Sequence, residues 1–96
     1  MRLTQNEVKI IKYNILRDIK DAKIILFGSR VDDDKKGGDI DIFVETKQIV
    51  TLKEQIKILT NFEIDGIFRK VDLVLKTPST KDQPIFHTAC KEGIQL

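Results

Sequence analysis

The chain has 96 residues, which is enough for one small domain around a single core, so we expect one domain over residues 1–96. Its 17 basic and 15 acidic residues leave a formal charge of only +2, which does not provide the basic surface of a nucleic-acid-binding protein. Its one cysteine excludes an internal disulfide, and no apolar run approaches the roughly 18 residues of a membrane span. We therefore expect a cytoplasmic protein without a membrane segment.

The chain opens with a predicted helix followed by a predicted strand. Thr4 and Glu7 have the spacing of a capping box, in which each side chain satisfies a free amide of the other at a helix start. Apolar residues then recur at helical intervals at Val8, Ile11, Ile15 and Ile19. The short apolar run from Lys23 to Phe27 predicts a buried strand.

Two apolar runs, joined by a polar loop, make up the sequence IILFGSRVDDDKKGGDIDIFVE between Ile24 and Glu45. Residues 29–38 lack the apolar residues of a buried element, and we interpret the acidic run 32–34 as solvated loop rather than as metal ligands. The second strand is predicted to open at Asp39. Because side chains alternate along a strand, Asp39 and Asp41 share one face, while Ile40 and Ile42 enter the core.

The paired aspartates and the turn before them indicate a binding site. Neighbouring carboxylates repel each other, and a hard divalent cation relieves this repulsion through oxygen ligands. At the end of the first strand, Gly28 permits close approach of a ligand to the backbone, and Ser29 offers an N–H and a hydroxyl group to a phosphate.

The rest of the chain predicts a helix, a strand and a final helix. Thr51 and Glu54 form a second capping box, followed by an apolar stripe and a helix end between residues 61 and 66; the stripe consists of Leu52, Ile56, Leu59 and Phe62. A strand over residues 70–76 places Asp72 opposite its apolar face, where it lies in water at the rim, pairs with a cation, or binds a metal. The last helix starts at residues 82–84 and ends at Gly93, and it carries the apolar residues Ile85, Phe86, Ala89 and Cys90, of which Cys90 is expected to be a small core residue.

This order of elements predicts an α/β fold. A small mixed β-sheet is expected to be covered by helices mainly on one face, which leaves the carboxylate-bearing face open.

Three features together resemble the nucleotidyltransferase superfamily that includes DNA polymerase beta: Gly28-Ser29, then Asp39-Ile40-Asp41, then Asp72 in a later strand. The small size of the chain is similar to that of the minimal nucleotidyltransferases of prokaryotes, the MntA-like antitoxins. The resemblance extends over the whole chain. It implies the nucleotidyltransferase fold and the transfer of a nucleoside monophosphate from a triphosphate.

The resemblance also implies roles for individual residues. Asp39 and Asp41 match the pair that binds two Mg²⁺ ions, and Asp72 matches the third carboxylate, which ligates the catalytic ion and helps to deprotonate the acceptor hydroxyl. All three carboxylates are therefore expected to be both catalytic residues and metal ligands.

On the phosphate side, Gly28 and Ser29 match the turn that holds the β and γ phosphates of ATP, and Arg30 often accompanies that serine in small members. The sequence departs from the usual pattern immediately afterwards, because Val31 and the acidic run 32–34 follow where a small residue and an arginine or glycine are common. The charge of this loop therefore differs from the pattern, and the resemblance leaves the choice of nucleotide open.

The minimal members resemble the antitoxin half of a two-gene pair whose other half is a HEPN-domain ribonuclease toxin. The resemblance thus implies that this protein transfers AMP from ATP to a tyrosine hydroxyl of a HEPN toxin. Two alternatives stay open: a binding module that masks its partner by contact, and a small-molecule nucleotidyltransferase that works with a separate helical subunit. Each involves a hetero-complex, and a homo-oligomer is compatible with all of them.

Overall fold

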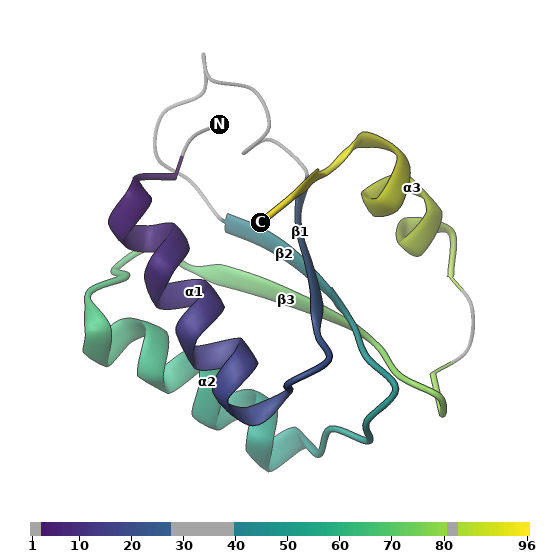
Figure 1. Ribbon diagram of the computed structural model, residues 1–96, viewed down its shortest axis with the longest axis horizontal. Coiled ribbons are helices and arrows are strands. Elements are labelled where there is room, and N and C mark those ends of the chain that lie inside the picture. The colour runs from purple at the N-terminus through teal and green to yellow at the C-terminus, as the bar shows by residue number, and fades with distance from the viewer. Residues whose placement is uncertain (1–2, 28–39, 81–82) are drawn as a thin grey trace.

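The computed structural model describes residues 3–27, 40–80 and 83–96, which form three helices and four strands. The strands make one mixed sheet in the order β3-β2-β1-β4, with β2 antiparallel to β1 and parallel to β3 (Figure 1). The predicted α/β fold is confirmed. The elements are α1 (Gln5–Asp18), β1 (Lys23–Phe27), β2 (Ile40–Glu45), α2 (Leu52–Asp65), β3 (Val71–Lys76), α3 (Pro84–Glu92) and β4 (Ile94–Gln95).

Both predicted capping boxes are present. The Glu7 backbone N–H donates to the Thr4 hydroxyl at 3.0 Å, and Thr4 N–H donates back to the Glu7 carboxylate at 3.0 Å. Thr51 and Glu54 repeat this exchange at the start of α2. Because these bonds satisfy amides that lack a partner inside the helix, they fix where each helix begins. At fourteen residues each, α1 and α2 are too short to cross a membrane, as is α3.

The larger core lies between one face of the sheet and the pair α1 and α2 (Figure 1). Ile11, Ile15 and Ile19 are fully buried there, as their spacing predicts. The predicted stripe of α2 is partly wrong, because Leu52 and Ile56 are exposed and the buried residues are Ile58 and Phe62. The physical reason is that α2 packs against both the sheet and α1, which turns its buried side toward α1.

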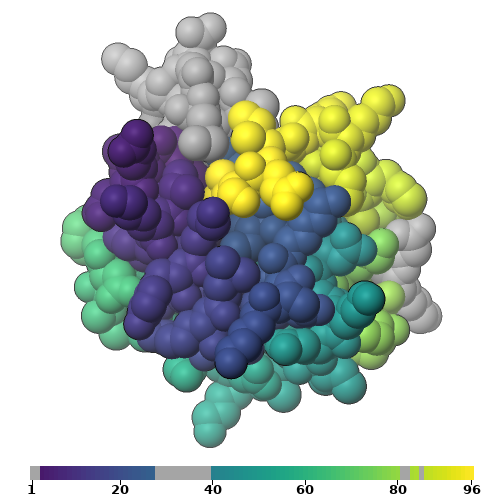
Figure 2. All heavy atoms as spheres, in the orientation of Figure 1, coloured from purple at the N-terminus to yellow at the C-terminus, as the bar shows by residue number. Residues whose placement is uncertain are grey.

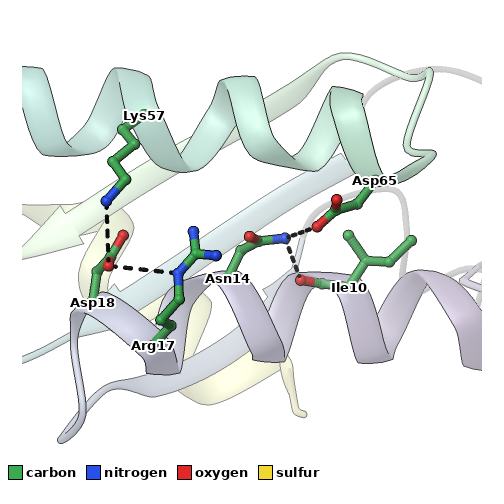
Figure 3. Close-up of polar contacts among 6 residues, drawn as sticks. All are labelled: Ile10, Asn14, Arg17, Asp18, Lys57 and Asp65. Atoms are coloured by element: carbon green, nitrogen blue, oxygen red, sulfur yellow. Dashed lines mark hydrogen bonds and ion pairs between the residues drawn. The ribbon is translucent and has the colours of Figure 1, made fainter.

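Polar contacts fix α2 against α1 (Figure 3). The fully buried Asn14 donates from Nδ2 to the Ile10 carbonyl at 3.0 Å and to Asp65 Oδ2 at 2.9 Å. Further along the two helices, Lys57 Nζ lies 3.7 Å from Asp18 Oδ1. These contacts show that the side of α2 that carries Lys57 and Asp65 faces α1.

The opposite face of the sheet carries a smaller core under α3. The Phe86 ring lies 5.5 Å from the Phe43 ring, measured between centroids, and Ala89 is fully buried beside them. The carboxylate-bearing face is therefore not open over its whole length, which corrects the prediction. Cys90 is exposed rather than in the core, because Phe86 and Ala89 occupy the sheet-facing side of this short helix.

The C-terminal residues close the edge of the sheet beside β1. Ile94 and Gln95 pair with Leu26 and Ile25, and the Leu96 N–H donates to the Ile24 carbonyl at 2.9 Å. In Figure 2 these residues (yellow) lie against α1 (purple) and β1 (blue). With β4 at one edge, β3 forms the other edge of the described sheet.

Candidate active site

Two of the predicted acidic residues lie side by side at one end of the sheet. Asp41 is the second residue of β2 and Asp72 the second residue of β3, and the parallel register pairs them directly. Ile40 and Ile42 on either side of Asp41 are fully buried in the larger core, so alternation directs the Asp41 side chain to the face that carries α3. Asp72 shares that face because it is directly opposite in register.

Three rows of side chains cross the α3 face of the sheet from β1 to β3. The rows are Phe27, Asp41 and Asp72; Ile25, Phe43 and Val74; and Lys23, Glu45 and Lys76. The middle row is apolar and packs under Phe86 and Ala89 of α3. The carboxylate row lies beyond it, at the end of the sheet where β1 ends and β2 and β3 begin. Phe27 belongs to the core under α3, so the two carboxylates border this core without being part of it.

The carboxylate pair combines repulsion with access to solvent. Like charges directly opposite each other on neighbouring strands are destabilising. Lys70 Nζ, 3.7 Å from Asp72 Oδ1, partly balances the charge, but 42% of the Asp72 side chain and 71% of the Lys70 side chain are exposed. A surface ion pair of this kind leaves carboxylate oxygens accessible. Oxygen donors in this arrangement fit a hard divalent cation.

The other predicted site residues lie outside the described part of the chain. These are Asp39, Gly28, Ser29 and Arg30. Their chain neighbours are described, since Phe27 immediately precedes Gly28 and Ile40 immediately follows Asp39. Phe27 is also the register partner of Asp41, so β1 ends beside the carboxylate pair. Within residues 3–27, 40–80 and 83–96, no three acidic, histidine or cysteine side chains gather as a metal cluster.

Comparison with known families decides the class of protein. The family model described as "Polymerase beta, Nucleotidyltransferase" matches residues 8–96. The chain belongs to this nucleotidyltransferase family. A search of curated proteins finds no match to the chain. Nucleotidyltransferases of this family use a nucleoside triphosphate and a divalent metal ion, in agreement with the carboxylate pair on β2 and β3.

Sequence reasoning missed Lys70 as a neighbour of the site in this nucleotidyltransferase. Lys70 precedes Asp72 by two positions, and the alternation of a strand places such residues on one face. This two-residue spacing is the feature of the sequence from which the proximity of Lys70 to Asp72 could have been predicted. Because the Lys70 ammonium lies near an Asp72 carboxylate oxygen, a cation that binds there has to compete with it or displace it.

Proposed function

We propose that this nucleotidyltransferase transfers AMP from ATP to a tyrosine hydroxyl of a partner HEPN-type toxin, and so acts as the antitoxin of the pair. The observation that carries the proposal is the in-register pair Asp41 and Asp72 at the accessible end of the sheet. The family match over residues 8–96 supports the nucleotidyl transfer on which the proposal rests.

The proposed reaction assigns distinct tasks to the residues. The acceptor oxygen attacks the α phosphorus, the bond between the α phosphorus and the α–β bridging oxygen breaks, and pyrophosphate leaves. The hydroxyl proton passes to the Asp72 carboxylate, whose partial exposure on the α3 face of the sheet lets an acceptor on another protein reach it. Asp41, together with Asp39 and Asp72, would hold Mg²⁺, which when bound supplies Lewis acidity and charge neutralisation. Gly28, Ser29 and Arg30 are proposed to bind the β and γ phosphates.

A labelling experiment tests this function. The purified protein is incubated with the toxin, Mg²⁺ and α-labelled ATP, and in parallel with the other three labelled nucleoside triphosphates. Asp41→Asn and Asp72→Asn are expected to lower the rate of label transfer at least about 100-fold, because each removes a charge from the reacting centre. Glu45→Gln is the matched control, since Glu45 lies on the same face of β2 at its far end.

The two alternatives predict different outcomes. Unchanged labelling by Asp72→Asn would overturn the catalytic assignment of that residue. If no nucleotide labels the toxin while both variants still neutralise it and bind it, contact masking is the function. Label that appears on a small molecule only when a helical subunit is added would instead indicate a small-molecule nucleotidyltransferase.

A further inference from the structure

The outer edge of β3 carries backbone groups that point away from the described sheet. The carbonyls of Lys70 and Lys76 accept hydrogen bonds from β2 and from Thr46 after it, so even-numbered residues of β3 direct their backbone groups toward β2. Val71, Leu73 and Leu75 therefore direct their N–H and C=O groups outward. Among the described residues no strand pairs with this side, and all six β3 residues are partly exposed. A six-residue open edge of this kind is a template for pairing.

An apolar surface of α2 adjoins this edge. We define the α2 stripe as Leu52, Ile56 and Leu59, which share one side of the helix by their spacing. Leu52 is 70% exposed and Ile56 is 55% exposed. Since Lys57 and Asp65 face α1 (Figure 3), the α2 stripe points away from α1. Leu59 and Val71 of β3 line the same pocket of about 290 Å³, which places the stripe beside the β3 edge.

We propose that a second copy of the chain pairs with this edge, β3 against β3 in antiparallel orientation, about a twofold axis at Val74. In this register Leu73 lies opposite Leu75 of the second copy, and Asp72 lies opposite its Lys76. Both leucines direct their backbone groups outward, so the two copies exchange four hydrogen bonds around the axis. The inference does not depend on the proposed toxin partner.

Charge complementarity selects this register among those that keep equivalent faces of the two sheets together. With the axis at Val74, each Asp72 lies opposite a Lys76, Leu73 lies opposite Leu75, and Val71 lies opposite Thr77. With the axis at Leu73, Lys70 would lie opposite Lys76, and like charges directly opposite are destabilising. With the axis at Leu75, Lys76 would lie opposite Val74 and Asp72 opposite Pro78, so neither charge would gain a partner in the second copy beside the one in its own chain, which is Glu45 for Lys76 and Lys70 for Asp72. Lys76 therefore favours the register with the axis at Val74, and the meeting of Lys70 with Lys76 opposes the register with the axis at Leu73.

The same twofold symmetry would cover the exposed apolar side chains of the α2 stripe. A twofold axis perpendicular to the sheet keeps α2 of both copies on one side, so each α2 stripe faces the other across the axis in a self-complementary contact. The pairing also brings Lys76 of the second copy beside Asp72, and thus adds a positive charge at the rim of the carboxylate pair. Dimerisation would then alter the electrostatics of the site itself.

Disulfide trapping tests the register. In a Cys90→Ser background, which removes the exposed native thiol, Val74→Cys places two cysteines opposite each other in a non-hydrogen-bonded pair. Their Cα atoms would be about 4.5 Å apart, within the range of a disulfide. Lys70→Cys is the control, because Lys70 lies opposite Pro78 and its two copies are about 27 Å apart. We expect a reducible dimer from Val74→Cys and none from Lys70→Cys.

Sedimentation equilibrium of the native sequence, from micromolar to millimolar concentration, tests the association itself. We expect twice the chain mass, and we expect Lys76→Glu to raise the dissociation constant at least about tenfold, because it replaces the two ion pairs between the copies by repulsion. The substitution also breaks the ion pair of Lys76 with Glu45 of its own chain, so its control has to do the same to Glu45. Lys23→Glu also places a glutamate opposite Glu45, but on β1 and away from the β3 edge, and should have little effect on association. A monomer at all concentrations, or equal cross-linking of the two cysteine variants, would overturn the proposal. So would a different protein pairing with β3 while the chain alone stays monomeric.

Discussion

The Asp21 carboxylate forms hydrogen bonds that connect two turns, at the end of the sheet remote from Asp41 and Asp72. Asp21, which precedes β1, accepts hydrogen bonds from the Thr46 hydroxyl and, at 2.8 Å, from the Lys47 backbone N–H. The Thr46 hydroxyl oxygen in turn accepts from the Gln48 N–H at 3.0 Å. The Thr46 hydrogen bond, followed by that of Lys47, lowers the pKa of Asp21 below its ordinary value. Asp21 is thus stabilised in its charged form in the folded chain.

This shift predicts how stability depends on pH. Because the folded pKa of Asp21 is below the unfolded one, its contribution is fully present above the unfolded pKa of about 4 and is lost as pH falls through the folded pKa. Asp21→Asn should therefore lose less stability than the native sequence between pH 6 and pH 2, measured by urea unfolding at each pH. Glu92→Gln removes an exposed carboxylate of α3 as the control. An unchanged pH dependence in Asp21→Asn would contradict the assignment.

At the scale of elements, Gly93 sets the path from α3 to β4. Its N–H donates to the Ala89 carbonyl at 2.9 Å, and the chain turns here into the strand that pairs with β1. A Cβ on Gly93 would collide with the Ile25 side chain and the Ala89 carbonyl, and would lie 2.8 Å from the Leu26 carbonyl. The connection therefore requires a residue without a side chain.

Gly93→Ala should accordingly lower the free energy of unfolding by about 1–3 kcal/mol, because backbone atoms, which yield less easily than a side-chain end, must shift. Urea unfolding measures the difference. Lys91→Ala, at an exposed position in the last turn of α3, is the control and should stay within about 0.5 kcal/mol of the native sequence. A Gly93→Ala variant as stable as this control would mean that α3 and β4 adjust freely.

The elements that the sequence predicted well are those specified locally. Capping boxes at Thr4 and Thr51 give the helix starts, and the bounded apolar run gives β1 from Lys23 to Phe27 without error. The face of α2 was predicted less well, because the choice between Leu52 and Ile58 depends on contacts with α1 that lie far away in sequence. β4 was not predicted, since two residues carry no periodicity.

The features of the candidate site also fall into those that are specified locally and those that depend on contacts distant in sequence. Asp41 and Asp72 were identified by strand alternation and by resemblance, but their direct pairing is a matter of register between strands separated by α2, which no local pattern determines. The position of α3 on the carboxylate-bearing face was missed for a related reason. The spacing of Phe86 and Ala89 shows that α3 has a buried side but not which face of the sheet receives it.

At the scale of the whole molecule, the proposed cation site at the carboxylate pair predicts a link between cation binding and folding. The unfolded chain separates Asp41 from Asp72, so a divalent cation held by both binds the folded state alone and stabilises it, by about 2.7 kcal/mol at 100 times its dissociation constant. Thermal unfolding should show a midpoint that rises with Mg²⁺ in the native sequence and in Glu45→Gln. The rise should be much smaller in Asp41→Asn and Asp72→Asn. An equal rise in all four proteins would place the cation elsewhere.

The parallel pairing of β2 with β3 also has a consequence during synthesis. Asp72 leaves the ribosome about 30 residues after Asp41, so at about 5–20 residues per second roughly 2–6 s pass between them. Throughout that interval the apolar β2 has no β3 beside it, and α2, which begins at its own capping box, is made in the meantime. The nascent chain thus presents an open strand to its surroundings before it has a complete carboxylate pair, and this stage is where we expect a need for chaperone protection.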